Sequence, residues 1–362
     1  MKQKNIILTI LFLILLTLPA LDMLFHFSPV KELFEKRLPS EKPQFALSAA
    51  YPKNFEKYFD DSYGFRKTLI ASNSKIMDKI FDESPDARAV IGKDDWFYFD
   101  NYNSLLDAQG KVEMPDEMVR RAVAAFYRNW QVMRVNDIDY LLVIAADKAT
   151  IYPEFLPDYI HPTNHHRVDK FLAALKRSHP YFPVLDLRPT LLAAKKNEVI
   201  YQKTDTHWNR RGAHYAYVEI AKKLRLKPHL RAEYENKEDE MIRGDISDIM
   251  SVDAQNINYD LREKFHITAY QDEIEDVENF HKPVVMSNEN KNLPRLFVYK
   301  DSFFGELMGF TAEHFSQSIY VNEFPCDINY ETIKNFHPNV VIQEFWEGRV
   351  EAVLSRCNTS NN

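Results

Sequence analysis

The chain has 362 residues, of which 45% are hydrophobic and 13% aromatic. This composition is typical of a globular protein with one large domain or slightly more, and it excludes disorder throughout. Its 46 Lys and Arg residues against 53 Asp and Glu residues give a net charge of −7, which argues against a nucleic-acid-binding protein. Two cysteines are too few for a disulfide scaffold.

The N-terminal segment indicates export from the cytoplasm. Lys2 and Lys4 precede the uncharged run 5–21, which is about long enough to span a bilayer. The residues before Ala20 are not the small ones that a signal-peptidase site requires, so we favour an uncleaved membrane anchor over 1–25. A cleaved signal peptide is the alternative. In both cases the positive-inside rule places the rest of the chain outside the cytoplasm.

Residues 26–85 predict a helical segment next to the membrane, with two helices on either side of a turn at Tyr63 and Gly64. The aromatic, alternating segment 87–100 then predicts a hairpin or two short strands. We therefore expect a new domain over 86–355.

Helical and strand patterns alternate along this domain. The continuous apolar run 140–146 follows a helical segment and is typical of a strand buried on both faces. The same alternation continues to the C-terminus, so an α/β fold with a mostly parallel sheet is the economical topology. The charged segment of about 226–292 reads as an insertion or meander, and its acidic runs as solvated surface.

Two short motifs carry residues suited to nucleophilic catalysis. Asp205 and His207 lie two residues apart on a loop that enters a helix, where the carboxylate can orient the imidazole. Ser302 lies on a strand-to-helix turn, where a serine is exposed and backbone N–H groups can face an oxyanion. Each motif alone is more simply explained by helix capping and packing. Together they supply a nucleophile, a base and an orienting acid.

The segments TDTHWNRRGAHYAY and VYKDSFFGELM, with IGKDDWFYFDN and HPNVVIQEFWEGRV, resemble the extracytoplasmic SGNH-hydrolase-like polysaccharide O-acetyltransferases of the AlgJ and AlgX type. The resemblance runs from about Tyr51 to Val350. It implies a three-layer SGNH-hydrolase-like domain in which the catalytic Asp and His precede the Ser, a permuted order. It assigns Asp205, His207 and Ser302 as the triad.

The resemblance also implies a reaction and partners. An acetyl group would pass through an acetyl-serine intermediate to a hydroxyl of an exopolysaccharide or cell-envelope glycan, alginate-like. A membrane-bound O-acyltransferase would be the donor partner, and the catalytic domain would be periplasmic, anchored to the inner membrane. No cofactor, metal or nucleic acid is implied.

Four further residues have two readings each. Lys148, after the buried strand, could contact an anionic sugar or the oxyanion, or be a surface lysine. Trp208 could form a stacking wall for a sugar ring, or pack to fix His207. Cys326 and Cys357 could form a disulfide in an oxidising compartment or be free buried thiols.

Three rival functions remain. A secreted carbohydrate acetylesterase would use the same triad with water as the acceptor. A non-catalytic glycan-binding assembly subunit would keep the fold alone. A metal site would take Asp205, His207 and His214 as ligands, although no dense cluster of further ligands accompanies them.

Overall fold

The computed structural model describes residues 2–25, 27, 39–77, 84–238, 241–250, 252, 254–272 and 283–357. Parts of the predicted helical segment (26, 28–38 and 78–83) and of the predicted insertion (239–240, 251, 253 and 273–282) lie outside these residues. The chain divides into two compact units, one of Met1–Ala89 with Asp245–Ala254, the other of Val90–Gly244 with Gln255–Asn362. Each unit is described by itself.

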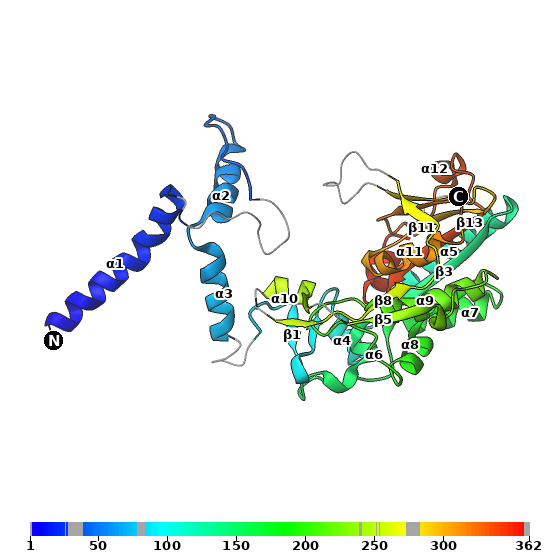
Figure 1. Ribbon diagram of the computed structural model, residues 1–362, viewed down its shortest axis with the longest axis horizontal. Helices are drawn as coiled ribbons and strands as arrows, with labels where there is room; N and C mark the ends of the chain where they lie inside the picture. Colours follow the sequence, from blue (N-terminus) through cyan, green and yellow to red (C-terminus); the bar gives the residue numbers. More distant parts are fainter. Residues whose placement is uncertain are drawn as a thin grey trace. The chain divides into compact units, whose positions relative to one another are not determined.

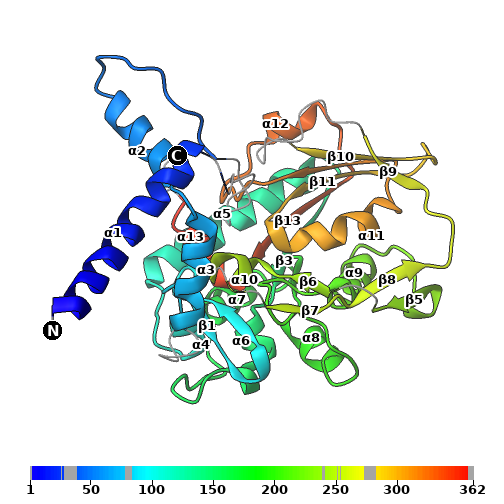
Figure 2. The ribbon, with the colours of Figure 1, turned by 60° about the vertical axis from the view of Figure 1, so that its left-hand side comes forward.

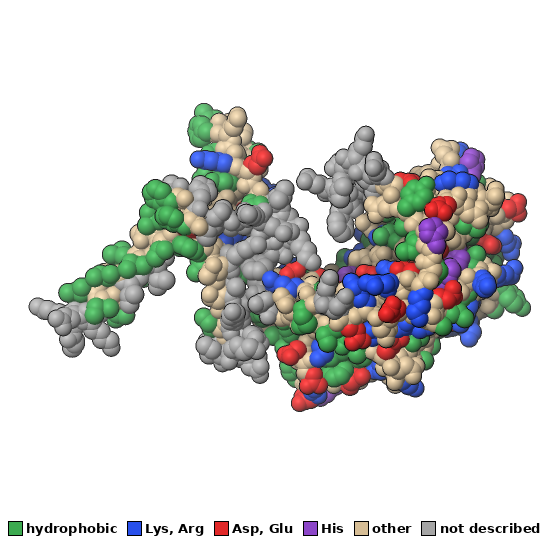
Figure 3. Space-filling model, viewed as in Figure 1, with side chains coloured by type: hydrophobic (Ala, Val, Ile, Leu, Met, Phe, Trp, Pro, Cys, Tyr) green, Lys and Arg blue, Asp and Glu red, His purple; other side chains and the backbone are tan. Residues whose placement is uncertain are grey.

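The first unit is helical. Helix α1 (Lys2–Phe25) contains an 18-residue window, Ile6–Met23, with a mean hydropathy of 2.5, so it is long and apolar enough to cross a membrane. Most of its described apolar side chains are exposed (Figure 3), whereas Pro19 is buried and Met23 is half-buried. Helices α2 (Tyr51–Ser62) and α3 (Arg66–Ile76) lie on either side of the predicted turn. Helix α10 (Asp245–Met250) belongs to the same unit.

The second unit is built on a seven-stranded sheet in the order β4-β3-β13-β11-β12-β10-β9. Its strands are β3 (Asp139–Ala145), β4 (Val184–Asp186), β9 (Ala269–Gln271), β10 (Val284–Asn288), β11 (Arg295–Tyr299), β12 (Gln317–Val321) and β13 (Val340–Trp346). The five strands from β4 to β12 are parallel, and β10 is antiparallel to both of its neighbours. The mostly parallel sheet predicted from the sequence is confirmed.

Helices cover both faces of this sheet. Leu141 and Val143 of β3 pack on the side of α8 (Arg188–Ala194) and α9 (Arg210–Lys223). Tyr140 and Leu142 pack on the opposite side, where the helices are α5 (Asp116–Val135), α7 (Arg167–Ser178) and α13 (Val350–Leu354). Alternate side chains of a strand point to opposite faces, so an uninterrupted apolar run fills both cores. This is the predicted three-layer α/β fold (Figures 1 and 2).

The segment predicted as an insertion contributes to the main sheet, because β9 and β10 extend it at one edge. Its other strands form two-stranded ladders, β5 with β8 and β6 with β7. The remaining described elements are β1 (Ala89–Ile91), η2 (Lys93–Asp95), β2 (Phe97–Phe99), α4 (Ser104–Ala108), α6 (Lys148–Ile151), η3 (Pro153–Phe155), η4 (Arg231–Glu233), β5 (Tyr234–Lys237), β6 (Met241–Arg243), β7 (Gln255–Ile257), β8 (Asp260–Glu263), η5 (Ser302–Leu307), α11 (Met308–Ala312), α12 (Tyr330–Lys334) and η6 (Glu347–Arg349).

Cys326 and Cys357 form a disulfide, with their Cα atoms 5.1 Å apart. Both residues are buried. The bond joins the segment after β12 to the end of α13, and it decides between the two readings that the sequence left open.

Candidate active site

A short loop before α9 holds Asp205 and His207. It is closed by an antiparallel bridge between Tyr201 and Trp208. At its end, the Asn209 side chain accepts a hydrogen bond from the Gly212 backbone N–H at 3.0 Å and so caps α9. The two chemical residues therefore lie on a loop that enters a helix, as the sequence predicts.

Lys148 holds this loop in place through hydrogen bonds to backbone carbonyl oxygens. Its ammonium donates to the backbone carbonyl oxygens of Phe97 at 2.6 Å, Gln202 at 3.0 Å and Lys203 at 3.0 Å. Only 3% of the residue is exposed. This placement corrects both readings of Lys148: it is no surface lysine, and an ammonium directed at three carbonyls ties β2 to the loop and does not face a sugar or the oxyanion.

Thr204, immediately before Asp205, is fixed by a close backbone approach. Its hydroxyl accepts hydrogen bonds from the Gly244 backbone N–H at 3.2 Å and from the Asn256 amide at 2.5 Å. A Cβ atom on Gly244 would lie 2.1 Å from the Thr204 carbonyl oxygen. Only glycine allows this contact, so Gly244 helps to fix the position of the loop that holds Asp205 and His207.

Ser302 begins η5, three residues after β11 ends. Asp301 caps this turn, because one of its carboxylate oxygens accepts from the Phe303 backbone N–H at 2.9 Å. The other oxygen accepts from the Trp346 backbone N–H at 2.8 Å. Asp301 is 3% exposed. The nucleophile turn is thus fastened to the end of the neighbouring strand β13.

A second buried carboxyl supports this turn from β13. Glu344 accepts from the Asp301 backbone N–H at 3.0 Å. Burial, and then the charge of Asp301, raise the pKa of Glu344 well above its ordinary value, which favours the protonated form. Beside it, burial lowers the pKa of Lys300, whose ammonium donates to Asn322 at 2.7 Å.

Asp205, His207 and Ser302 form one chain of hydrogen bonds. His207 Nδ1 lies 2.7 Å from Asp205 Oδ1, and His207 Nε2 lies 2.7 Å from Ser302 Oγ. A carboxylate only accepts, so Nδ1 carries the proton and Nε2 of the neutral ring accepts from the Ser302 hydroxyl. Asp205 Oδ1 also accepts from the His207 backbone N–H at 2.9 Å. Ser302 is exposed, so substrate can reach its hydroxyl.

Trp208 lies behind the triad and does not form a wall open to a sugar. It is 1% exposed, and its ring packs edge-on against Phe303 at 5.2 Å. Phe303 in turn lies 4.8 Å from the His207 ring. Of its two readings, packing that supports His207 agrees with the structure, and the stacking role is corrected because both ring faces are buried.

A pocket of about 480 Å³ opens beside Ser302. Charged and amide side chains that sequence reasoning missed contribute to its walls, namely Gln202, Arg210, Asn258, Asp260 and Glu306. Loss of surrounding water raises the pKa of Glu306, an effect that Arg210 opposes and Asp260 reinforces. Glu306 lies four residues after Ser302, a spacing that could have suggested it. Asp260 comes from the segment whose fold the sequence did not reveal.

His214 does not join Asp205 and His207. Its Nε2 donates to the His229 carbonyl at 2.9 Å, and its ring packs edge-on against Tyr234. Burial lowers the pKa of His214 to about 4, so it is a neutral residue of the core. The three-ligand metal site considered for these residues is therefore not assembled.

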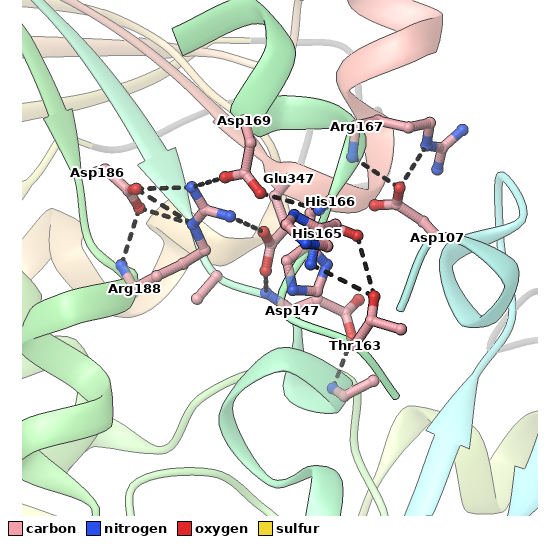
Figure 4. A network of polar contacts seen from close by, with 12 residues as sticks. Asp107, Asp147, Thr163, His165, His166, Arg167, Asp169, Asp186, Arg188 and Glu347 are labelled. Atoms are coloured by element: carbon pink, nitrogen blue, oxygen red, sulfur yellow. Dashed lines mark hydrogen bonds and ion pairs between the residues drawn. The ribbon is translucent and has the colours of Figure 1, made fainter. Parts of the chain in front are cut away.

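A second, partly buried network of charged side chains lies at the carboxyl ends of β3, β4 and β13 (Figure 4). The Arg188 guanidinium contacts carboxylate oxygens of Asp186 at 2.7 Å, Asp169 at 2.7 Å and Glu347 at 3.5 Å. Glu347 also accepts from the Asp147 backbone N–H at 2.6 Å. The three carboxylates balance the charge of Arg188. The network thereby connects the carboxyl ends of β3, β4 and β13.

Residues 89–278 match the family described as "SGNH hydrolase-like domain, acetyltransferase AlgX". The matched range includes Asp205 and His207 and ends before Ser302. The chain is also 25% identical over 213 residues to the "probable alginate O-acetylase AlgJ" of Pseudomonas syringae pv. tomato. That alignment covers 57% of this chain and 52% of the relative, so the chain spans about half the length of that curated relative.

Solved structures show the same fold. A DHHW family protein from Eubacterium siraeum matches with a TM-score of 0.52 at 15% identity, over 69% of this chain and 92% of that one. Bacillus cereus PatB1 with a sulfonyl adduct matches with a TM-score of 0.52 at 19% identity, over 72% of this chain and 96% of that one.

Proposed function

Because the chain belongs to the family of SGNH hydrolase-like acetyltransferases of the AlgX type, we propose that it is an O-acetyltransferase that acts on a polysaccharide outside the cytoplasm. The observation that carries this proposal is the continuous hydrogen-bond chain from Asp205 through His207 to Ser302. Its serine end is exposed beside a pocket. We assign Ser302 as the nucleophile, His207 as the general base and acid, and Asp205 as the residue that orients His207.

In the first half-reaction, Ser302 Oγ attacks the acetyl carbonyl carbon of the donor and its proton moves to His207 Nε2. Negative charge gathers on the carbonyl oxygen. The Ser302 backbone N–H, which has no hydrogen-bond partner within the described part of the chain, can stabilise it. The bond to the donor then breaks, and the leaving oxygen takes the proton from His207.

In the second half-reaction, a sugar hydroxyl passes its proton to His207 Nε2 while its oxygen attacks the acetyl-serine. The ester bond to Ser302 Oγ breaks, and Oγ recovers the proton. The neutral tautomer with its proton on Nδ1 is the one that both steps require, and the 2.7 Å contact with Asp205 favours it.

The N-terminal part completes the proposal. We assign 1–25 as a membrane anchor, 26–85 as a helical segment next to the membrane and 86–355 as the transferase domain. The apolar window of α1 supports the anchor. An anchored enzyme could receive its acetyl group from a membrane-bound O-acyltransferase, the partner that the family resemblance implies.

The test is intact mass spectrometry on the detergent-solubilised full chain with 4-nitrophenyl acetate, in the presence and absence of oligosaccharides. We expect an acetyl adduct in the native chain and in Ser355→Ala, a control at an exposed serine, and none in Ser302→Ala. Acetylated sugar should form when oligosaccharide is added. Rapid acetate release that ignores the acceptor would identify an esterase. Absence of any adduct would instead favour the non-catalytic subunit.

A further inference from the structure

The pocket beside Ser302 is acidic. Its lining contains three carboxylates, Asp205, Asp260 and Glu306, against one guanidinium, that of Arg210. His207 lies between Asp205 and Ser302 and is neutral when it acts as a base. Even with Glu306 protonated, the carboxylates outnumber the guanidinium. The whole chain, with a net charge of −7, adds a field of the same sign.

The Arg210 guanidinium is already paired with carboxylates of the protein. Arg210 Nε lies 3.5 Å from Asp260 Oδ1, and Arg210 also forms an ion pair with Glu263. Its guanidinium is stacked over the Phe310 ring at 4.7 Å. An incoming carboxylate would have to compete with two carboxylates of the protein for this cation. Within the described lining there is no second cation to receive it.

The other polar groups of the lining suit hydroxyls. Gln202 donates through its amide nitrogen to Asn258 at 3.0 Å, which leaves its buried Oε1 atom as an acceptor with no partner among the described residues. Glu306, one turn after Ser302, forms no hydrogen bond or ion pair with the described residues. Carboxylate and amide oxygens accept from sugar hydroxyl or ammonium groups, and a charged acceptor strengthens such a bond.

We propose that the acceptor is a glycan whose acceptor unit carries no carboxylate, a neutral sugar or an amino sugar, and that Asp260 and Glu306 exclude polyuronates such as alginate. This inference rests on the proposed O-acetyltransferase function and narrows its substrate. The exclusion is electrostatic, because like charges brought together in a partly desolvated site repel each other.

The experiment uses the full chain in detergent with 4-nitrophenyl acetate as the donor and three hexasaccharides of equal length. These are an N-acetylglucosamine oligomer, a glucosamine oligomer and a mannuronate oligomer. We compare acceptors by a ratio, kcat/KM for transfer to the better of the two glucosamine-type oligomers divided by kcat/KM for transfer to the mannuronate oligomer. We expect this ratio to be about tenfold or more, a difference of about 1.4 kcal/mol. Added salt should reduce the ratio.

The variant Asp260→Asn/Glu306→Gln should reduce the ratio at least about threefold by improving transfer to mannuronate. Glu331→Gln, an exposed carboxylate of α12 outside the pocket lining, should leave it unchanged. Transfer to mannuronate that equals or exceeds the other two, or a ratio that the double variant does not change, would overturn the acceptor assignment.

Acetyl-serine measured in the same samples without any acceptor separates this inference from its premise. If the adduct forms and mannuronate is the preferred acceptor, the inference fails and the transferase function stands. If no adduct forms, or if it only hydrolyses whatever the acceptor, the proposed function itself fails.

Discussion

Replacing Asp147 by Asn should change how the stability of the second unit depends on pH. Asp147 follows β3 and caps α6, because its Oδ1 atom accepts from the Ala149 backbone N–H at 2.6 Å. Burial, and then the charge of Glu347, raise the pKa of Asp147 to about 7. Figure 4 shows the two carboxyl groups in one network. Ionising Asp147 therefore costs free energy in the folded protein.

The direction and size of this pH dependence follow from the linkage between proton binding and folding. An aspartate that binds its proton more tightly when folded contributes stability that is fully present below its unfolded pKa and is lost as pH rises through its folded pKa. Because the pKa rises from 3.8 to about 7, the whole effect is about 4 kcal/mol. Between pH 5 and 8, about 2–3 kcal/mol of it should be lost. An Asn side chain keeps the acceptor for Ala149 and cannot ionise.

The measurement is urea unfolding at pH 5, 6, 7 and 8, followed by tryptophan fluorescence. All four tryptophans lie in the second unit. The free energy of unfolding should fall less steeply with pH in Asp147→Asn than in the native chain. Asp139→Asn, at an exposed carboxylate on the same strand, should follow the native curve. Parallel curves for the native chain and Asp147→Asn would refute the reasoning, because Asp147 would then titrate alike in both states.

Three further outcomes are expected. Asp205→Asn keeps the shape of the loop but favours the wrong imidazole tautomer, so acetyl transfer should fall by roughly 10⁴-fold. A fall of less than tenfold, measured as product per minute, would contradict the orienting role assigned to Asp205. Replacing Cys326 and Cys357 by Ser removes a cross-link between residues that are 31 positions apart in the chain. This change should lower the free energy of unfolding by about 3–4 kcal/mol. An unchanged urea midpoint would count against that. Lys148→Met leaves three carbonyls without their donor and should cost about 3 kcal/mol or more, seen as a lower melting temperature.

The parts of the fold that local patterns determine could be predicted from the sequence. The run 140–146 is apolar without interruption because β3 fills a core on each face. Asp205 and His207 are two residues apart, so their mutual contact is local. A strand followed by a turn and a helical pattern placed Ser302 at the carboxyl end of a strand, where an exposed side chain is expected.

The parts that depend on distant contacts could not be predicted. The partners of Lys148 lie more than fifty positions away, at Phe97 and Gln202. Nothing near Lys148 distinguishes an ammonium that binds carbonyls from one that faces solvent. Asp260 reaches the pocket only because β8 pairs with β5, and this charged pair of strands lacks the apolar pattern that identifies a buried strand.

The separation of Ser302 from His207 is set by the scaffold behind each of them. Ser302 stands on a turn that Asp301 fastens to the end of β13. His207 stands on a loop that the Lys148 ammonium fastens to β2. Neither support touches the reacting atoms, yet a shift of either one changes the 2.7 Å contact through which the proton moves. Such displacements reduce the rate of chemistry more than they weaken substrate binding. Damage to these supports should therefore appear in kcat for acetyl transfer, whereas damage to Asp260 or Glu306 should appear in the choice of acceptor.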